Sequence, residues 1–202
     1  MSALAFMTPD AAGAPARSPM HQLAEKAGAS FELVDGFELA TAYAGSGDYS
    51  ASVAFADRSH LVKLELNGPQ PHALKPGRAE RIDNNWWCPV TPARTLVLGR
   101  PSARGAAEAT GCDVVDLTSG LAALALIGPQ ANELLARFCA IDVRAQTTPV
   151  KGFRPGSVAR TPGYLLRTGE QELLILVGAA LGSYLWEVAA DAAEHLGGGP
   201  VA

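Results

Sequence analysis

Residues 112–144 read CDVVDLTSGLAALALIGPQANELLARFCAIDVR, and they carry the clearest structural pattern in the chain. Short runs rich in Val and Leu predict a pair of strands over 114–117 and 121–127. Gly128-Pro129 marks the turn that ends the second strand. Apolar residues spaced three and four positions apart then predict a helix over 130–138. The stretch therefore predicts strands packed against helices rather than an all-helical or all-strand fold.

Residues 163–196, GYLLRTGEQELLILVGAALGSYLWEVAADAAEHL, extend the same plan. They predict a hairpin with strands over 164–167 and 172–177, turning at Thr168-Gly169. A helix over 180–195 follows, because its apolar residues recur on one face and three glycines end it. The fold class predicted from this half is α+β, with antiparallel strands and packed helices.

The first half predicts similar elements in a shorter form. A short helix is expected over 20–28, where Ser18-Pro19 gives a cap and a first helical residue. Asp-Gly between two alternating runs predicts a hairpin over 30–43. Two further strands are expected over 49–55 and 60–67, and alternation places Lys63 on the polar face of the second.

Two polar or glycine-rich stretches, 70–85 and 99–111, predict loops. Between them, a strand is expected over 94–98. The adjacent Trp86 and Trp87 would face opposite ways in an extended segment, so one is expected in the core and the other at the surface or an interface.

The chain contains a possible internal repeat. Residues 60–69 (HLVKLELNGP) align without gaps on 120–129 (GLAALALIGP), and Asp57 and Asp116 lie just upstream, one position out of register. A strand that ends in Gly-Pro also recurs by chance, because turns favour these residues. If the similarity reflects duplication, it predicts two copies of one α+β unit rather than a solenoid.

This interpretation divides the chain into three parts. Residues 1–17 are expected to be a disordered tail, 18–99 the first repeat and 112–197 the second repeat of one domain. The length of 202 residues allows such a core to be buried.

Composition excludes several classes of function. Hydrophobic residues make up 48% and charged residues 18% of the chain, which is typical of a globular protein. A net charge of −4 with scattered Lys and Arg argues against a nucleic-acid partner. The longest apolar run is too short for a membrane-spanning helix. Together with the absence of a signal-peptide pattern, this predicts a cytoplasmic protein.

The cysteines and histidines do not predict a metal site. Three Cys without a C-x-x-C pair are expected to be reduced thiols, mostly buried. Four His residues form no pair at a ligand spacing, so no metal is expected. No catalytic constellation is recognisable either.

Two stretches carry a family resemblance. Residues 57–69, DRSHLVKLELNGP, and their second copy resemble the DLSHLGKLEVRGP signature of glycine-cleavage T proteins. Residues 167–177 and 184–187 (YLWE) are similar to the later RTGYTGEDGFEIYV and LWEAL stretches of that family. Residues 113–196 resemble still more closely the gamma subunit of heterotetrameric sarcosine oxidases.

The resemblance implies a duplicated folate-binding-domain-like fold and therefore tetrahydrofolate as a possible ligand. It also implies a carboxylate after the first repeat, but residues 88–94 contain no Asp or Glu. The family's later loop is shortened here to 168–171. The remaining candidates for holding a folate are Glu170, Glu172, Arg167, Tyr164 and Trp87. Solvent exposure in a hairpin is the alternative for the two glutamates.

These departures favour an accessory, non-catalytic subunit of a sarcosine oxidase complex, which would demethylate sarcosine and pass the one-carbon unit to tetrahydrofolate. Flavin and NAD would be held by larger flavoprotein partner subunits, since no G-x-G-x-x-G follows a strand. Trp87, Phe153 and apolar neighbours would offer a surface to those partners. Two alternatives stay open: a stand-alone folate-dependent aminomethyltransferase-like enzyme, and a non-catalytic folate-binding or regulatory module.

Overall fold

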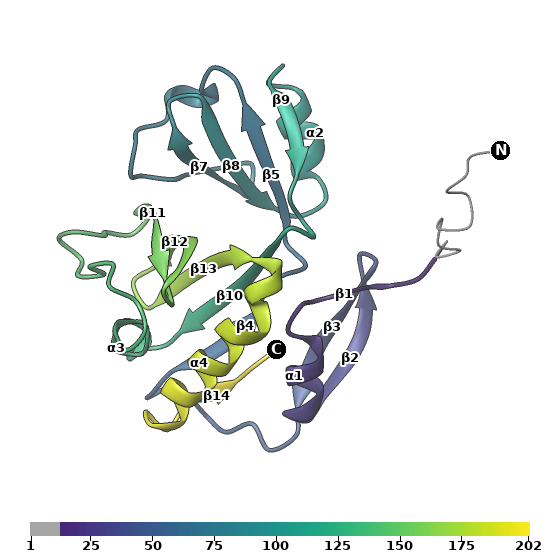
Figure 1. Cartoon of the computed structure of the whole chain (residues 1–202), viewed down its shortest axis with the longest axis vertical. Helices are drawn as coiled ribbons and strands as arrows, with labels where there is room; N and C mark the ends of the chain where they lie inside the picture. Colours follow the sequence, from purple (N-terminus) through teal and green to yellow (C-terminus); the bar gives the residue numbers. More distant parts are fainter. Residues whose placement is uncertain (1–12) are drawn as a thin grey trace.

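Three sheets form the body of the protein in a computed structural model that describes residues 13–202 (Figure 1). The six-stranded sheet has the order β11-β12-β13-β10-β4-β14, and the five-stranded sheet has the order β6-β7-β8-β5-β9. A small sheet with the order β1-β3-β2 lies beside them. The α+β prediction is confirmed, and the strands within the two larger sheets are antiparallel except where β14 joins β4.

The six-stranded sheet contains β4 (Ala54–Asp57), β10 (Leu121–Ile127), β11 (Phe153–Val158), β12 (Thr161–Gly169), β13 (Glu172–Gly178) and β14 (Gly199–Pro200). The five-stranded sheet contains β5 (Val62–Asn67), β6 (Glu80–Ile82), β7 (Asn85–Thr91), β8 (Arg94–Gly99) and β9 (Asp113–Asp116). The small sheet contains β1 (Ala16–Arg17), β2 (Ala29–Val34) and β3 (Phe37–Tyr43). The helices are α1 (His21–Lys26), α2 (Ala103–Glu108), α3 (Ala131–Ala136) and α4 (Gly182–Glu194), with short 3-10 turns η2 (Pro71–Ala73) and η3 (Ala179–Leu181). Within residues 13–202, none of these helices has the length and apolar character needed to cross a bilayer.

The small sheet confirms the hairpin expected over 30–43. Asp35 and Gly36 have φ values of 50° and 81°, the positive values that a tight two-residue hairpin turn requires. Helix α1 begins later than expected, because Met20 rather than Ser18 holds the N-cap position and no side chain caps it. The Ser18 hydroxyl instead accepts from the Met20 N–H at 3.0 Å, in the turn before the helix. The tail expected over 1–17 lies mostly outside the described residues, but β1 pairs in parallel with β3, so ordered structure begins earlier than predicted.

The strand pair predicted over 114–117 and 121–127 is wrong, although both strands exist. Strand β9 pairs with β5 in one sheet, whereas β10 pairs with β13 and β4 in the other. The chain crosses between the sheets at 117–120, as it also does at 58–61. Each predicted repeat therefore gives one strand to the sheet built mainly by the other.

The two crossings are related by an approximate two-fold symmetry in their hydrogen bonds. The Ser59 hydroxyl accepts from the Ala123 N–H at 3.1 Å, and the Thr118 hydroxyl accepts from the Lys63 N–H at 3.2 Å. Because Lys63 and Ala123 hold the same position in the aligned segments, each hydroxyl binds the strand that follows the other crossing.

The aspartates before the crossings obey the same symmetry. Asp57 accepts from the Ser59 N–H, and Asp116 accepts from the Thr118 N–H, each at 2.8 Å. Asp57 pairs with Leu124 across the six-stranded sheet, and Asp116 pairs with Leu64 across the five-stranded sheet. The register difference between the two aligned segments therefore amounts to one extra residue between Asp116 and Ala123, compared with the interval from Asp57 to Lys63.

Strand registers extend the correspondence along both sheets. Arg94 pairs with Asn67, and Glu172 pairs with Ile127, so β8 and β13 begin at matching positions. Trp86 pairs with Leu98, and Tyr164 pairs with Leu176, so β7 and β12 match as well. The order of β6, β7, β8, β5 and β9 in one sheet thus matches that of β11, β12, β13, β10 and β4 in the other.

Gly128 occupies a position that no other residue fits without strain. Its φ is +122°, and a Cβ there would lie 2.7 Å from the Ser52 carbonyl oxygen. We therefore expect Gly128→Ala to lower the free energy of unfolding by about 2 kcal/mol. Urea denaturation would measure the change, and Gly178→Ala is the matched control, because nothing lies within 4 Å of a Cβ at that position. Equal stability of the two variants would contradict the expected crowding.

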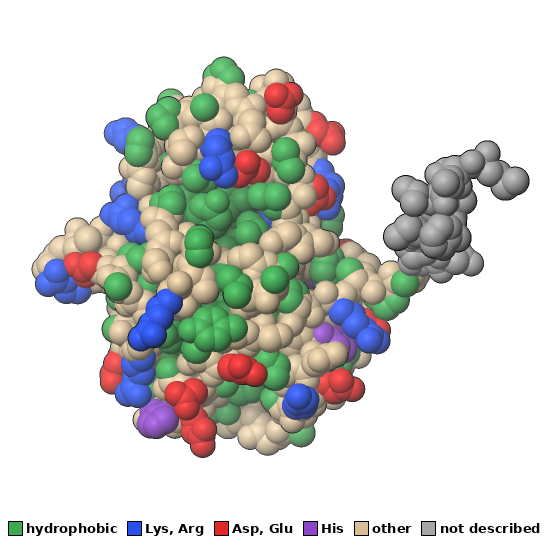
Figure 2. Space-filling view, in the orientation of Figure 1, with side chains coloured by type: hydrophobic (Ala, Val, Ile, Leu, Met, Phe, Trp, Pro, Cys, Tyr) green, Lys and Arg blue, Asp and Glu red, His purple; other side chains and the backbone are tan. Residues whose placement is uncertain are grey.

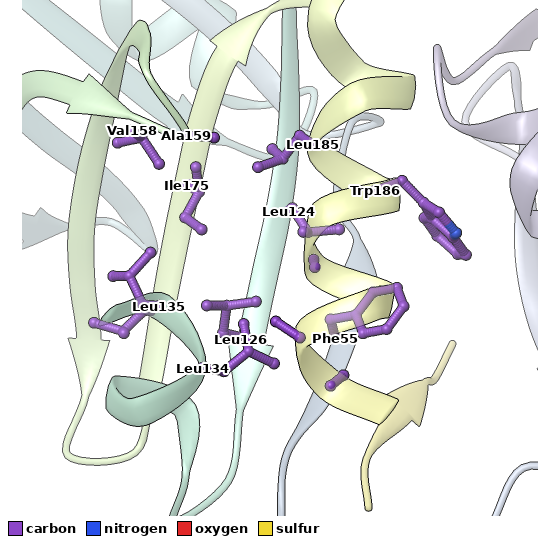
Figure 3. Close-up of a cluster of buried hydrophobic side chains, with 14 of the residues drawn as sticks. Phe55, Leu124, Leu126, Leu134, Leu135, Val158, Ala159, Ile175, Leu185 and Trp186 are labelled. Atoms are coloured by element: carbon purple, nitrogen blue, oxygen red, sulfur yellow. The ribbon is translucent and has the colours of Figure 1, made fainter. Parts of the chain in front are cut away.

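The main hydrophobic cluster lies between the six-stranded sheet and the helices α3 and α4 (Figure 3). Leu124 and Leu126 of β10 are fully buried, as is Leu185 of α4. The Trp186 ring packs edge-on against Phe55, with ring centroids 4.9 Å apart, and it also lies 6.3 Å from Tyr43 of the small sheet. Each such side chain contributes on the order of 2 kcal/mol by its burial, so Trp186 joins the small sheet to the body.

Lys63 departs from the simple alternation of its strand. Its side chain is 0% exposed, and its ammonium group donates to the carbonyls of Ser59, Leu61 and Thr118 at 2.7, 2.9 and 3.0 Å. Burial lowers the pKa of Lys63 to about 8, against the opposing effect of Asp57 and Asp116. A buried ammonium therefore links the two crossings.

Several loop predictions require correction. The stretch 99–111 contains α2, whose buried Ala103 and Ala107 face the five-stranded sheet, because alanine favours helices even in a glycine-containing run. The stretch 70–85 contains β6, and the strand expected over 49–55 begins only at Ala54. These differences change element boundaries but not the fold class.

Charged side chains lie mainly around the edges of the view in Figure 2, whereas hydrophobic side chains gather near the middle of that face. Figure 1, which shows the molecule from the same direction, places the junction of the two larger sheets at this level. Apolar surface at this level is therefore accessible.

Candidate functional site

A cavity of about 240 Å³ lies between the six-stranded and five-stranded sheets. It is called the first cavity below, and both sheets and the first crossing contribute to its wall. Its lining residues are Arg58, Leu61, Asn84, Trp86, Leu98, Gly99, Arg100, Ala125, Thr168, Glu172 and Leu174. An apolar wall with a few charged groups is typical of a small-molecule site.

The two tryptophans divide as expected. Trp87 pairs with Val97 and is 1% exposed in the core of the five-stranded sheet, where its ring lies edge-on to His72 at 4.5 Å. Trp86 is half-buried and lines the first cavity instead. The aromatic wall of this site is therefore Trp86.

Glu172 is the carboxylate of the first cavity. It begins β13, is exposed, and forms no ion pair with any residue in the part of the chain that the structure describes. An ionised carboxylate with free lone pairs can accept two parallel hydrogen bonds from a ligand. Glu172 can therefore bind a group with neighbouring N–H donors.

Arg58 and Arg100 give the first cavity a positive side. Arg58 makes long contacts of 3.4 Å to the Asp57 carbonyl through Nη1 and of 3.3 Å to the Ala202 carbonyl through Nη2, and its remaining N–H groups can donate to a ligand. Asn84 adds an amide from the turn before β7, where its φ is 63°. The cavity thus combines one carboxylate with two cationic donors and a neutral amide.

Of the five residues predicted to hold a folate, the first cavity includes Glu172. The structure places Tyr164 in a different groove, stacked on Phe153 with ring centroids 5.7 Å apart. Glu170 lies in the exposed turn between β12 and β13, and its backbone carbonyl accepts from Arg167. Trp87 lies in the core. The structure therefore does not bring the five residues together in one site.

Arg167 lies in the interior and is 3% exposed. Its guanidinium donates to the carbonyls of Val143 and Thr148 at 2.8 and 3.3 Å, and to those of Gly169 and Glu170 at 3.3 and 2.7 Å. These contacts engage its donors within the protein. Arg167 therefore holds loops together and is not among the residues lining the first cavity.

The suggestion that Trp87 and Phe153 offer surface to a partner requires correction. Both are buried within the chain, at 1% and 0% exposure. Phe153 lies in the cluster between the two larger sheets, whereas Trp87 lies in the cluster that Leu74 and helix α2 form on the other face of the five-stranded sheet. Residues 88–94 lie in β7 and β8 rather than at the first cavity. The residues that sequence reasoning missed are Arg58, Asn84, Trp86 and Arg100. Of these, Arg58 stands within the DRSH segment, where the resemblance gave a signal.

A larger open groove of about 560 Å³ runs along α4, beside Phe138 and Tyr184. Its rim carries Glu187, Asp191 and Arg137. It lies on one side of the molecule and does not involve the crossings. The first cavity is lined by a wider range of chemical groups, so it is the stronger candidate for a ligand-binding site.

Among residues 13–202, no cluster of three or more His, Cys, Asp or Glu could hold a metal ion. Cys88, Cys112 and Cys139 are free thiols, and burial raises the pKa of Cys88. Cys112 is only half-buried, whereas the other two are buried as expected.

The fold is that of aminomethyltransferases. The aminomethyltransferase T of the Bartonella henselae glycine cleavage system superposes with a TM-score of 0.68 at 21% identity, over 86% of this chain and 56% of that one. The chain is also 25% identical to an aminomethyltransferase of Symbiobacterium thermophilum, in an alignment that covers 90% of this chain and 59% of that protein. The chain thus spans little more than half the length of these aminomethyltransferases.

A chain of the heterotetrameric sarcosine oxidase from Corynebacterium sp. U-96 matches over a larger share of its own length. Its TM-score is 0.68 at 21% identity, and the match covers 90% of this chain and 96% of that one. No protein-family model matches the sequence. At this identity the likeness establishes the fold.

Proposed function

We propose that this chain is an accessory subunit, similar to the gamma subunit, of a sarcosine oxidase complex. The complex would demethylate sarcosine oxidatively and transfer the one-carbon unit to tetrahydrofolate. The observation that carries the proposal is the match to 96% of a heterotetrameric sarcosine oxidase chain, against 56% and 59% of two aminomethyltransferases.

The chemistry of the site supports a non-catalytic role. Flavin and NAD would be bound by larger partner subunits, since G-x-G-x-x-G does not occur in this sequence. The described residues that line the first cavity include one carboxylate, Glu172, and no histidine, cysteine or second carboxylate to share a proton with it. The chain would therefore contribute to assembly while other subunits perform the oxidation.

Purification of the tagged full-length chain from its source cells tests this proposal. We expect it to co-elute in fixed proportion with flavin absorbance and with sarcosine-dependent oxygen consumption. The separately expressed chain should show neither. A chain that elutes alone, from cells whose sarcosine oxidase is active and elutes elsewhere, would overturn the proposal.

The first cavity supports a second candidate, a folate-binding module. Glu172 supplies the acceptor that the N–H groups of a pterin ring need, and Trp86 supplies a stacking surface. A volume of about 240 Å³ is below the usual range for drug-sized ligands, so it suits the ring rather than the whole folate. A stand-alone transferase would in addition need catalytic groups that this cavity does not supply.

Anaerobic calorimetric titration with tetrahydrofolate distinguishes these candidates. The folate module predicts micromolar affinity, about −8 kcal/mol, and about a tenfold loss in Glu172→Gln, because a charge-assisted hydrogen bond contributes about 1.5 kcal/mol or more. Glu170→Gln is the matched control, since Glu170 does not line the cavity. Absence of binding, or equal loss in both variants, would remove the folate module from consideration.

A further inference from the structure

The approximate two-fold symmetry that relates the two sheets also relates two cavities. The second cavity is an open groove of about 470 Å³ between the sheets, lined in part by Val90, Arg94, Leu121, Pro162 and Tyr164. The groove does not include the residues of the first cavity. Binding of a ligand in the second cavity would not depend on the proposed subunit role.

The residue correspondence follows from the strand registers. Leu61 and Leu121 occupy the same position in the aligned segments, one in each cavity. Trp86 of β7 corresponds to Tyr164 of β12, since their partners Leu98 and Leu176 hold matching positions. Each cavity therefore has an aromatic ring and a leucine in equivalent places.

At one corresponding position, the two cavities have side chains of opposite charge. Glu172 begins β13 and lines the first cavity, whereas Arg94 begins β8 and lines the second. These residues correspond because each pairs with the last residue of the central strand, Ile127 or Asn67. At this position the first cavity offers a hydrogen-bond acceptor, whereas the second offers a cationic donor, which favours an anionic group on the ligand.

The aromatic wall of the second cavity is held in a fixed orientation. Tyr164 stacks on the fully buried Phe153 with an interplanar angle of 13°, so one of its faces is occupied and the ring cannot tilt freely. Pro162 and Val90 provide further rigid or branched apolar surface. This arrangement suits a flat ring.

Arg94 is positioned to bind an anionic group. Its side chain is 42% exposed, and one of its nitrogens, Nη2, is paired with Glu65, whose side chain is 16% exposed. A guanidinium has five N–H donors, so a carboxylate on a bound ring can be accepted beside Glu65. The neighbouring acid holds the guanidinium in place but also weakens its attraction for an anion.

We propose that the second cavity is a binding site for small planar aromatic carboxylates, in which Tyr164 stacks on the ring and Arg94 pairs with the carboxylate. In the corresponding position the first cavity has Glu172, although Arg58 and Arg100 line it as well. The two cavities would thus differ in the group that a ligand meets beside the aromatic ring.

Amide-resolved NMR titration of the full chain with indole-3-acetate tests the site. We expect saturable shifts at Leu121, Tyr164 and Gly178. Tryptamine, which has the same ring and a positive charge, should not saturate these amides. Arg94→Gln should weaken indole-3-acetate binding about tenfold, and Glu65→Gln should strengthen it, because the competing carboxylate is removed.

Arg104→Gln provides the matched control. Arg104 forms an ion pair with Asp116 elsewhere on the five-stranded sheet, and its side chain is 46% exposed, close to that of Arg94. Its loss should leave binding unchanged. The proposal is overturned if indole-3-acetate and tryptamine bind alike, if shifts are confined to Trp86 and Gly99 of the first cavity, or if no amide shift saturates. Unchanged affinity in folded Arg94→Gln and Glu65→Gln variants would overturn it as well.

Discussion

Replacing Lys63 with methionine is expected to lower the free energy of unfolding by about 3 kcal/mol at pH 7. Three carbonyls, those of Ser59, Leu61 and Thr118, would lose their donor at about 2 kcal/mol each. Removal of a charge that burial disfavours returns about 3 kcal/mol. Urea denaturation measures the net effect, and the exposed Lys75→Met serves as the control, with an expected change below about 0.5 kcal/mol.

The difference in free energy of unfolding between wild type and Lys63→Met is also expected to depend on pH. The pKa of Lys63 is lowered to about 8 in the folded protein from 10.5, so between these values the unfolded chain binds more protons. Stability due to this group is therefore constant below pH 8 and rises with pH above it. The difference between wild type and Lys63→Met should widen by about 2 kcal/mol from pH 7.5 to pH 9.5.

Other groups oppose this trend in both proteins. Burial raises the pKa of Tyr43 to about 12, and it raises the pKa of Cys88 too, so their contributions fall as pH passes their unfolded values. Because both proteins contain these groups, the difference between the two curves isolates Lys63. Parallel curves would show that the ammonium does not titrate in this window.

Arg167→Met is expected to destabilise the protein by about 4 kcal/mol. The substitution removes a buried guanidinium that donates to four carbonyls and leaves those acceptors in an enclosed region. Two of the carbonyls, those of Val143 and Thr148, belong to the loop between α3 and β11, and the others belong to the turn between β12 and β13. The effect should appear as a lower urea midpoint with both regions exposed to amide exchange.

Arg167→Lys should lose about half as much stability, because it keeps the charge but cannot reproduce the planar fork of donors. Arg137→Met is the control: Arg137 lies on the surface, 3.5 Å from Glu133 one helical turn away, so its loss should cost less than about 0.5 kcal/mol. A loss for Arg167→Met no larger than for Arg137→Met would contradict the structural role of Arg167.

Local signals predicted many of the elements because they depend on neighbouring residues. Asp35-Gly36 defines its hairpin through positive φ values, and Gly128-Pro129 ends β10 where the chain turns sharply. The amphipathic spacing of α4 similarly identifies a helix of 13 residues within the predicted range. These features need no knowledge of distant contacts.

Long-range pairing could not be predicted in the same way. Val114 and Leu121 lie close in sequence, and nothing in their side chains shows that their strands enter different sheets. Lys63 follows an alternating pattern that normally faces solvent, but the second crossing covers it. Its burial depends on residues such as Thr118, which only the folded chain brings near.

The candidate site likewise combines residues that local signals predicted with residues that only long-range packing brings together. Alternation showed that Trp86 and Trp87 must diverge, but the choice between them depends on which face of β7 meets the other sheet. Glu172 was among the predicted residues because the resemblance covers its hairpin, and it lines the first cavity. Arg100 follows β8 and reaches the first cavity through the packing of two sheets, which leaves no local pattern.

The exchange of β4 and β9 makes the two copies inseparable as folding units. A fragment cut between Gly111 and Cys112 would keep β4 without its partner β10, and the other fragment would keep β9 without β5. Closure of the chain also depends on very distant residues, since the Ser52 hydroxyl donates to the Gly197 carbonyl across 145 residues. Such high contact order slows folding. The five-stranded sheet has all its strands once residue 116 is present, whereas the six-stranded sheet, which runs from β4 to β14, needs nearly the whole chain.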